Sequence, residues 1–235
     1  FLWEQYLERT REPILLSDFY KIERQYTGKE RMIFKMTKFI FRKANIVVFS
    51  TEWQKNIMQG PYEMDSAKIH VIENLYEDKK KRSIIPKDRI ILSPSRNIFL
   101  KNKANLQKAI SIVRQRFPEV IFNDKISSNN ELESRMVNSY FLVVPSLSEV
   151  SPNIVLQAIS LGVPALVTSD CGIKDRLGNA VIWINPLDPK SIADDIMQLF
   201  DSEMYNQQIK KISEFSFIHN NKDIVSEYLD IINKL

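Results

Sequence analysis

Three features of the sequence have the chemistry of a diphosphate-binding site. Arg96 and Lys101 follow one short apolar segment, Glu149 follows another, and Ser151 and Pro152 stand in the order that begins a helix. An arginine binds two phosphate oxygens as a planar fork, and a lysine adds a point charge. The first turn of a helix offers free N–H groups at the positive end of its dipole. The alternative is that both cations are solvated surface residues, as most Arg and Lys side chains are.

An alternating pattern of strands and helices surrounds these residues. Strands are expected at 89–93, 120–122, 140–144, 165–168 and 180–184, and helices around 106–113, at 132–138, from 151 to 162 and from 188 to 200. Such alternation implies a parallel sheet with helices on both faces. Ligands bind at the carboxyl ends of the strands in a sheet of this kind. The predicted fold class is therefore α/β with a Rossmann-like parallel sheet.

Four segments are expected along the chain. They are 1–75, the tail of a first and mostly helical domain; 76–88, a linker; 89–220, the complete parallel-sheet domain; and 221–235, a C-terminal helix that docks back toward the first domain. The linker is charged, contains Pro86 and shows no periodicity. The chain starts without an initiator methionine, so we expect the first domain to be only partly present.

A basic stripe runs along the helix that is expected at 29–43. Arg31, Lys35, Lys38 and Arg42 recur at helical spacing, and most other positions are Met, Ile or Phe. One interpretation is a helix that packs on the core and has a solvated basic edge. The other is a helix that lies on an anionic membrane surface through its Phe, Lys and Arg side chains.

The composition excludes several classes of protein. It is ordinary for a globular protein, with 44% hydrophobic and 26% charged residues. The formal net charge of +4 suits phosphate-bearing substrates or an anionic membrane surface, and no nucleic-acid-binding motif is present. The lone Cys171 forms no internal disulfide, and two histidines without a Cys/His cluster predict no metal site. No apolar run is long enough to span a membrane. Because a lone cysteine suits a reducing compartment, we expect a cytoplasmic protein, either free or peripheral on the inner face of the membrane.

Three common motifs are absent, and each absence disfavours one function. The sequence has no G-x-G-x-x-G, no G-x-x-x-x-G-K-[ST] and no G-x-S-x-G. These motifs belong to nicotinamide dehydrogenases, P-loop NTPases and α/β-hydrolases. No cofactor is predicted.

Residues 145–168, PSLSEVSPNIVLQAISLGVPALVT, resemble the signature of a large family of retaining GT-B glycosyltransferases, the glycosyl transferases group 1. That signature is a Glu, seven residues and a second Glu, followed by a helix of small residues and Gly-x-Pro. Glu149 fits the first position and Gln157 stands at the second, so the pattern here is E-x7-Q. The resemblance runs from about residue 44 to 200 and implies a GT-B-type fold.

Residues 93–101, SPSRNIFLK, are similar to the family's loop in which an Arg and a Lys five positions later bind the donor diphosphate. The site that the resemblance implies has Glu149 at the donor sugar as the catalytic residue, Arg96, Lys101 and the helix start Ser151, Pro152 and Asn153 at the diphosphate, and Gln157 at the ribose. A neutral amide at the ribose lacks charge assistance, which costs about 1 kcal/mol of binding.

The implied function is the transfer of a sugar from a nucleotide-diphosphate sugar to a glycan or lipid-linked acceptor. The implied enzyme is a retaining hexosyltransferase that needs no metal or other cofactor. Two departures keep an alternative open, a non-catalytic GT-B-like binding or partner subunit: the amide of Gln157 and the lack of the family's glycine-rich acceptor loop. Asn123 and Asp124 also replace a glycine-rich turn near the base. A nucleotide-sugar isomerase is disfavoured because no proton-transfer dyad is apparent.

Overall fold

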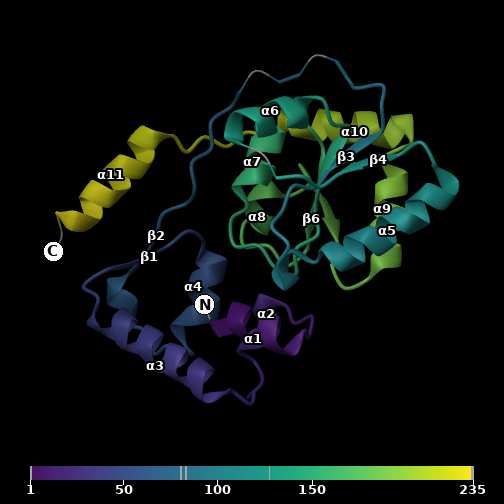
Figure 1. Ribbon diagram of the computed structural model, residues 1–235. Coiled ribbons are helices and arrows are strands. Elements are labelled where there is room, and N and C mark those ends of the chain that lie inside the picture. The colour runs from purple at the N-terminus through teal and green to yellow at the C-terminus, as the bar shows by residue number, and fades with distance from the viewer. Residues whose placement is uncertain (1, 80, 83, 127, 234–235) are drawn as a thin grey trace.

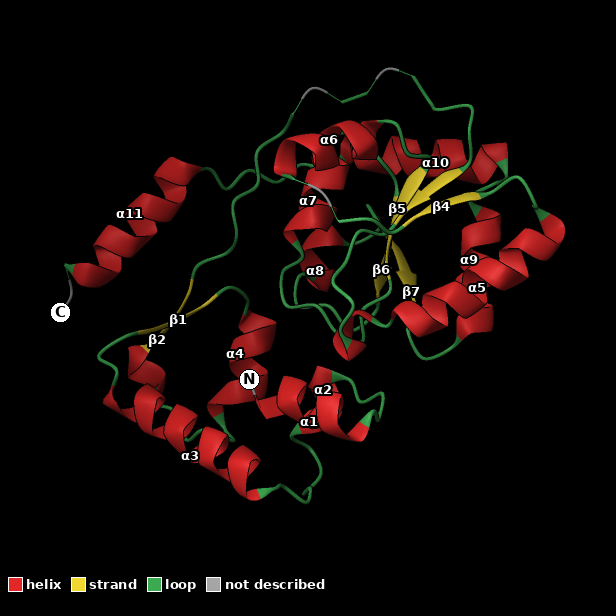
Figure 2. Cartoon of the chain, viewed as in Figure 1, coloured by secondary structure: helices red, strands yellow, loops and turns green. Residues whose placement is uncertain are grey.

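The chain folds into two parts, each built around its own sheet (Figure 1). The computed structural model describes residues 2–79, 81–82, 84–126 and 128–233. Within these residues, a two-stranded sheet lies in the N-terminal part and a five-stranded sheet in the part that follows. Figure 2 shows helices around the larger sheet. The prediction of an α/β fold with a parallel sheet is confirmed.

The larger sheet has the strand order β4-β3-β5-β6-β7, and all neighbouring strands are parallel in the described residues. Its strands are β3 (Ile90–Leu92), β4 (Ile121–Asn123), β5 (Phe141–Val144), β6 (Ala165–Thr168) and β7 (Ile182–Ile184). Every residue of β5 and β6 is buried. Their continuous apolar sequences, FLVV and ALVT, are typical of parallel strands that helices cover on both faces.

Helices cover both faces of this sheet. One face carries α5 (Lys103–Arg116) and α9 (Pro189–Gln198), and the other carries α6 (Asn129–Val137), α7 (Asn153–Ser160) and α8 (Lys174–Leu177). The sequence pattern did not predict α10 (Ser202–Glu214), whose Tyr205 packs on the α5 side and whose Ile212 packs on the α7 side. Gly162 follows α7 with a φ of 73°, a left-handed conformation that favours glycine and ends the helix.

The N-terminal part is mostly helical. Its elements are α1 (Leu2–Thr10), α2 (Leu16–Phe19), α3 (Gly28–Lys43), β1 (Val47–Phe49), α4 (Glu52–Gln59) and β2 (Ile69–Val71), with short 3-10 turns at Ser66–Lys68 and, in the second part, at Phe99–Lys101. β1 and β2 pair in parallel. Helix α3 begins in a capping box in which Thr27 and Glu30 bond each other's backbone N–H.

The N-terminal helices lie against the loops that follow β3 and β5. Buried apolar residues of α1 and α2 form one cluster with Leu147. The N–H of Leu16 donates to Ser148 Oγ at 2.7 Å, and the N–H of Phe99 donates to a carboxylate oxygen of Glu8 at 2.7 Å. The two parts are therefore joined next to Glu149.

The segment expected to be a linker, 76–88, holds no helix or strand among its described residues. Arg82 fixes this segment to the larger sheet, because its guanidinium donates to the carbonyl oxygens of Val137 and Tyr140 at 3.2 and 3.1 Å. The C-terminal helix α11 (Asn221–Ile232) has no buried residue, so its docking on the first part stays a prediction. Among the described residues, no helix combines the length and apolarity that a membrane span needs.

Gly172 lies where the two parts meet, and replacing it tests that junction. A Cβ at this position would lie 2.9 Å from both Thr51 Oγ1 and Trp53 Cε3, and closer still to the carbonyl oxygen of Val150. We expect Gly172→Ala to lower the free energy of unfolding by about 2 kcal/mol through overpacking, as measured by urea denaturation. The matched control is Gly60→Ala, where a Cβ meets nothing within 4 Å. Equal stability of the two variants would contradict the close junction.

Candidate functional site

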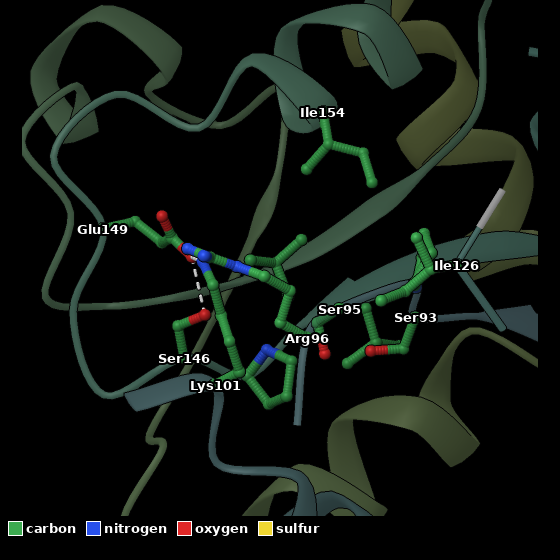
Figure 3. Close-up of a pocket in the computed structure, with 12 residues that line it drawn as sticks. Ser93, Ser95, Arg96, Lys101, Ile126, Ser146, Glu149 and Ile154 are labelled. Carbon is green, nitrogen blue, oxygen red and sulfur yellow. Dashed lines mark hydrogen bonds and ion pairs between the residues drawn. The ribbon is translucent and has the colours of Figure 1, made fainter. Parts of the chain in front are cut away.

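A cavity of about 340 Å³ opens at the carboxyl ends of β3 and β5 (Figure 3). In the strand order, β4 lies on one side of β3 and β5 on the other, so the chain reverses its direction of winding between β3 and β5. Ligands of open parallel sheets bind outside the strand ends at such a reversal. We name this cavity the switch-point pocket, and its lining is Ser93, Pro94, Ser95, Arg96, Lys101, Ile126, Val143, Val144, Pro145, Ser146, Glu149 and Ile154.

Glu149 and Lys101 form an ion pair inside this pocket. Lys101 Nζ lies 2.6 Å from Glu149 Oε1, and the two side chains are only 23% and 14% exposed. Ser146 Oγ donates a second hydrogen bond to the same carboxylate oxygen, at 2.6 Å. The carboxylate is therefore held from two loops, one after β3 and one after β5, while its second oxygen has no partner among the described residues.

Hydrogen bonds to the loop that follows β6 fix the backbone of Glu149. Its N–H donates to the carbonyl oxygen of Asp170 at 2.9 Å, and its carbonyl oxygen accepts from the N–H of Gly172 at 2.8 Å. The Asp170 carboxylate accepts a hydrogen bond from Ser148 and one from the N–H of Ser17 in α2. The position of the Glu149 side chain thus depends on residues from both parts of the chain.

Arg96 is the exposed cation of the pocket. In Figure 3 its side chain extends beside that of Lys101 toward Glu149. Within the part of the chain that the structure describes, no hydrogen bond or ion pair holds its guanidinium, whereas Lys101 is bound to Glu149. An incoming anion therefore meets one available cation and one that it must share with a carboxylate.

The start of α7 differs from the prediction. The helix begins at Asn153, and Pro152 occupies the capping position without a side-chain cap. The predicted cap, Ser151, is wrong, because its Oγ is buried and has no partner among the described residues. Its carbonyl oxygen instead accepts a hydrogen bond from Asn74 Nδ2 at 3.1 Å.

Asn153 and Gln157 line a different cavity, of about 330 Å³, which lies beside the segment that joins the two parts. We name it the linker pocket, and its other residues are Asn74, Leu75, Tyr76, Glu77, Lys79, Leu156 and Ser160. The structure therefore brings Arg96, Lys101 and Glu149 together in one pocket. Asn153 and Gln157 lie in the second pocket, and Ser151 and Pro152 are in the lining of neither.

Several residues of the switch-point pocket were missed from the sequence. Ser95 Oγ is buried and has no partner within the described ranges, and Ser146 binds Glu149. Ile126 and Ile154 contribute apolar side chains to the lining of the pocket. Isolated Ser and Ile residues carry no spacing signal, so only the folded strand ends identify them. Over the same ranges, no group of three or more His, Cys, Asp or Glu residues is arranged to hold a metal ion.

Comparisons with known proteins cover the sheet that carries this pocket. Residues 89–202, just under half of the chain, match the family described as "Glycosyl transferases group 1". The matched segment contains β3 to β7 and all three charged residues of the switch-point pocket. No curated protein sequence matches the chain.

Solved structures show the same fold. Sucrose-phosphate synthase from Thermosynechococcus elongatus has a TM-score of 0.69 at 13% identity, over 99% of this chain and 71% of that one. Anabaena HepE in complex with UDP and glucose has a TM-score of 0.68 at 13% identity, over 89% and 68%. TarM of S. aureus, in a complex that includes UDP, has a TM-score of 0.66 at 16% identity, over 88% of this chain but 47% of that one. At such identities the likeness shows the fold alone, which is of the GT-B type.

Cys171 lies beside Glu149, because the two residues form an isolated parallel bridge. The reactivity of its thiol therefore measures how tightly the loop that carries Glu149 is packed. Burial, aided by the charges of Glu149 and Asp170, raises the pKa of the Cys171 thiol to about 12. A raised pKa keeps the thiol protonated, and only the thiolate attacks a disulfide reagent. We expect the folded protein to react roughly 10³-fold more slowly at pH 8 than the urea-unfolded chain, whose thiol has an ordinary pKa. A folded-state rate that stops rising with pH near pH 9 would contradict this.

Proposed function

We propose that this chain binds a nucleotide-diphosphate sugar in the switch-point pocket and transfers the sugar to a glycan or lipid-linked acceptor, as a retaining, metal-independent hexosyltransferase. One observation carries the proposal: Arg96, Lys101 and Glu149 meet at the strand ends where winding reverses. The pocket lies in the segment that matches the glycosyltransferase family. Its volume of about 340 Å³ lies in the range typical of small-molecule sites.

The charges of the pocket suit a leaving diphosphate. Arg96 is available to bind two phosphate oxygens, and Lys101 would turn from Glu149 toward the same group. Once Lys101 is shared, Glu149 keeps its hydrogen bond from Ser146 and has oxygen lone pairs for the hydroxyls of the donor sugar. Cations that are already in place stabilise the negative charge that develops on the leaving diphosphate, which is electrostatic catalysis.

The ribose would lie along the first turns of α7. Ile154 lines the switch-point pocket, whereas Asn153 and Gln157 on the same helix line the linker pocket. A nucleotide whose diphosphate is at Arg96 would therefore extend past Ile154 to place its ribose at Gln157.

The second candidate function is a binding subunit without catalysis. It uses the same pocket for a nucleotide, and the amide of Gln157 in E-x7-Q favours it. The chain spans 47% of TarM and about 70% of two other similar structures. A lipid-linked acceptor would bring the chain to the inner membrane surface, with Arg31, Lys35 and Arg42 toward anionic lipid and Lys38 held by Glu63.

Titration calorimetry with UDP, GDP and ADP tests the diphosphate site. We expect one of the three to bind, and Arg96→Ala to weaken that binding by roughly tenfold or more, because a hydrogen bond to a charged group contributes about 1.5–3 kcal/mol. The affinity for the corresponding nucleoside should not change. The matched control is Lys108→Ala, on the exposed side of α5. No binding of any nucleotide by folded protein would refute the donor site, and equal loss for nucleoside and nucleotide would make Arg96 structural.

Glu149→Gln separates the enzyme from the binding subunit. Removing the negative charge frees Lys101, so we expect the nucleoside diphosphate to bind several-fold more tightly. Donor turnover, followed as release of nucleotide from the nucleotide sugar, should fall by roughly 10²-fold or more, since one preorganised stabilising group is lost. The binding subunit would be favoured if Glu149→Gln binds the nucleotide more tightly but the unmodified protein shows no turnover when acceptor glycans are supplied.

A further inference from the structure

Helix α3 presents a stripe of apolar side chains to solvent. Met32, Met36, Phe39 and Ile40 are between 55% and 62% exposed, and their spacing of i, i+4, i+7 and i+8 places them on one side of the helix. Only Glu30 of the sixteen residues of α3 is buried. In Figure 1, α3 lies at the edge of the molecule, away from the larger sheet. An exposed apolar stripe of this length marks a surface that contacts another apolar phase.

Cations surround a hollow along the same helix. The hollow has a volume of about 450 Å³, and its lining is Lys35, Lys38, Phe39, Arg42 and Lys43. Lys38 is engaged, because its Nζ lies 2.6 Å from a carboxylate oxygen of Glu63. Lys35, Arg42 and Lys43 have no ion-pair partner among the described residues. Three available cations thus lie directly beside Phe39.

The C-terminal helix α11 also has an exposed apolar face, so exposure alone does not indicate which kind of partner binds such a helix. Val225, Leu229 and Ile232 of α11 are also more than half exposed. The charged residues of α11 are mainly acidic, however, with Asp223, Glu227 and Asp230. An anionic surface would repel α11 and attract α3, so charge distinguishes the two apolar faces.

We propose that α3 lies flat on an anionic lipid bilayer. Met36, Phe39 and Ile40 enter the boundary between headgroups and acyl chains, and Lys35, Arg42 and Lys43 bind lipid phosphates around the hollow. Of the stripe predicted from the sequence, Lys38 is bound to Glu63 and supports the helix rather than the lipid. Free phosphate would use the cations but leave the apolar stripe exposed to water, which is why lipid fits better. The inference does not depend on glycosyl transfer.

Flotation with vesicles tests the proposal. We expect the chain to float with vesicles of phosphatidylcholine and phosphatidylglycerol, not with phosphatidylcholine alone, and the bound fraction to fall as salt screens the charges. Lys35→Glu/Arg42→Glu should weaken binding at least about tenfold. Phe39→Ser/Ile40→Ser should also release the chain although its charge is unchanged, and this second variant separates insertion from attraction by charge alone.

Two matched controls make the result specific to α3. Lys108→Glu/Lys210→Glu reverses two exposed lysines elsewhere, and because each reversal subtracts two charges, both charge variants lower the formal net charge from +4 to 0. Leu229→Ser/Ile232→Ser removes an equal number of exposed apolar side chains from α11. Both controls should still float. Circular dichroism and nucleotide titration show whether each variant remains folded, so loss of flotation is distinct from loss of the donor site.

Three outcomes would overturn the proposal. The first is equal release by either control. The second is flotation that inorganic phosphate abolishes fully and that Phe39→Ser/Ile40→Ser leaves unchanged, which would make the hollow a phosphate site. The third is a dimer in sedimentation that the α3 variants dissociate, because the acidic α11 of a second copy would then cover α3 instead of lipid.

Discussion

The ion pair between Lys101 and Glu149 joins two loops that are far apart in sequence, and the geometry of the switch-point pocket depends on it. It forms only because β3 and β5 are neighbours, paired at Ile91 and Phe141, so that their carboxyl ends open at one edge of the sheet. A partly buried ion pair contributes little to stability, since desolvation offsets much of the attraction. The ion pair matters for binding, because it holds the Glu149 carboxylate in the pocket next to the cations that an anionic ligand requires.

The same carboxylate depends on the first part of the chain. The backbone of Glu149 is bonded to residues 170 and 172, and Asp170 is bonded to the N–H of Ser17 in α2. Gly172 has no room for a side chain because Thr51 and Trp53 of the first part lie against it. A relative movement of the two parts would therefore disturb the loop that carries Glu149, which couples the arrangement of the parts to the state of the pocket.

Features that depend on local sequence could be predicted, and features that depend on distant contacts could not. The apolar runs of β5 and β6 and the helical spacing on α5 identified the sheet and its helices, and the spacing of Arg96 and Lys101 identified two residues that do meet Glu149. The capping role of Ser151 was wrong, since Pro152 holds the capping position and the carbonyl oxygen of Ser151 accepts a hydrogen bond from Asn74, 77 residues away. Ser95 and Ile126 have no local signal, since only the fold of the strand ends brings them to the pocket.

The amide of Gln157 lies beside charged residues of α6 and the linker. Glu133 of α6 is bonded to Lys79 at 2.5 Å, and hydrogen bonds from Lys79 and from the Gln157 amide hold the pKa of that carboxyl below its usual range. A second carboxylate at 157 would stand close to Glu133, and two neighbouring like charges repel. The neutral amide can donate to Glu133 and accept from another group at the same time. The neutral amide of Gln157 therefore suits the charges of the linker and α6, and any ribose hydroxyl that reaches Gln157 competes with Glu133 for its donors.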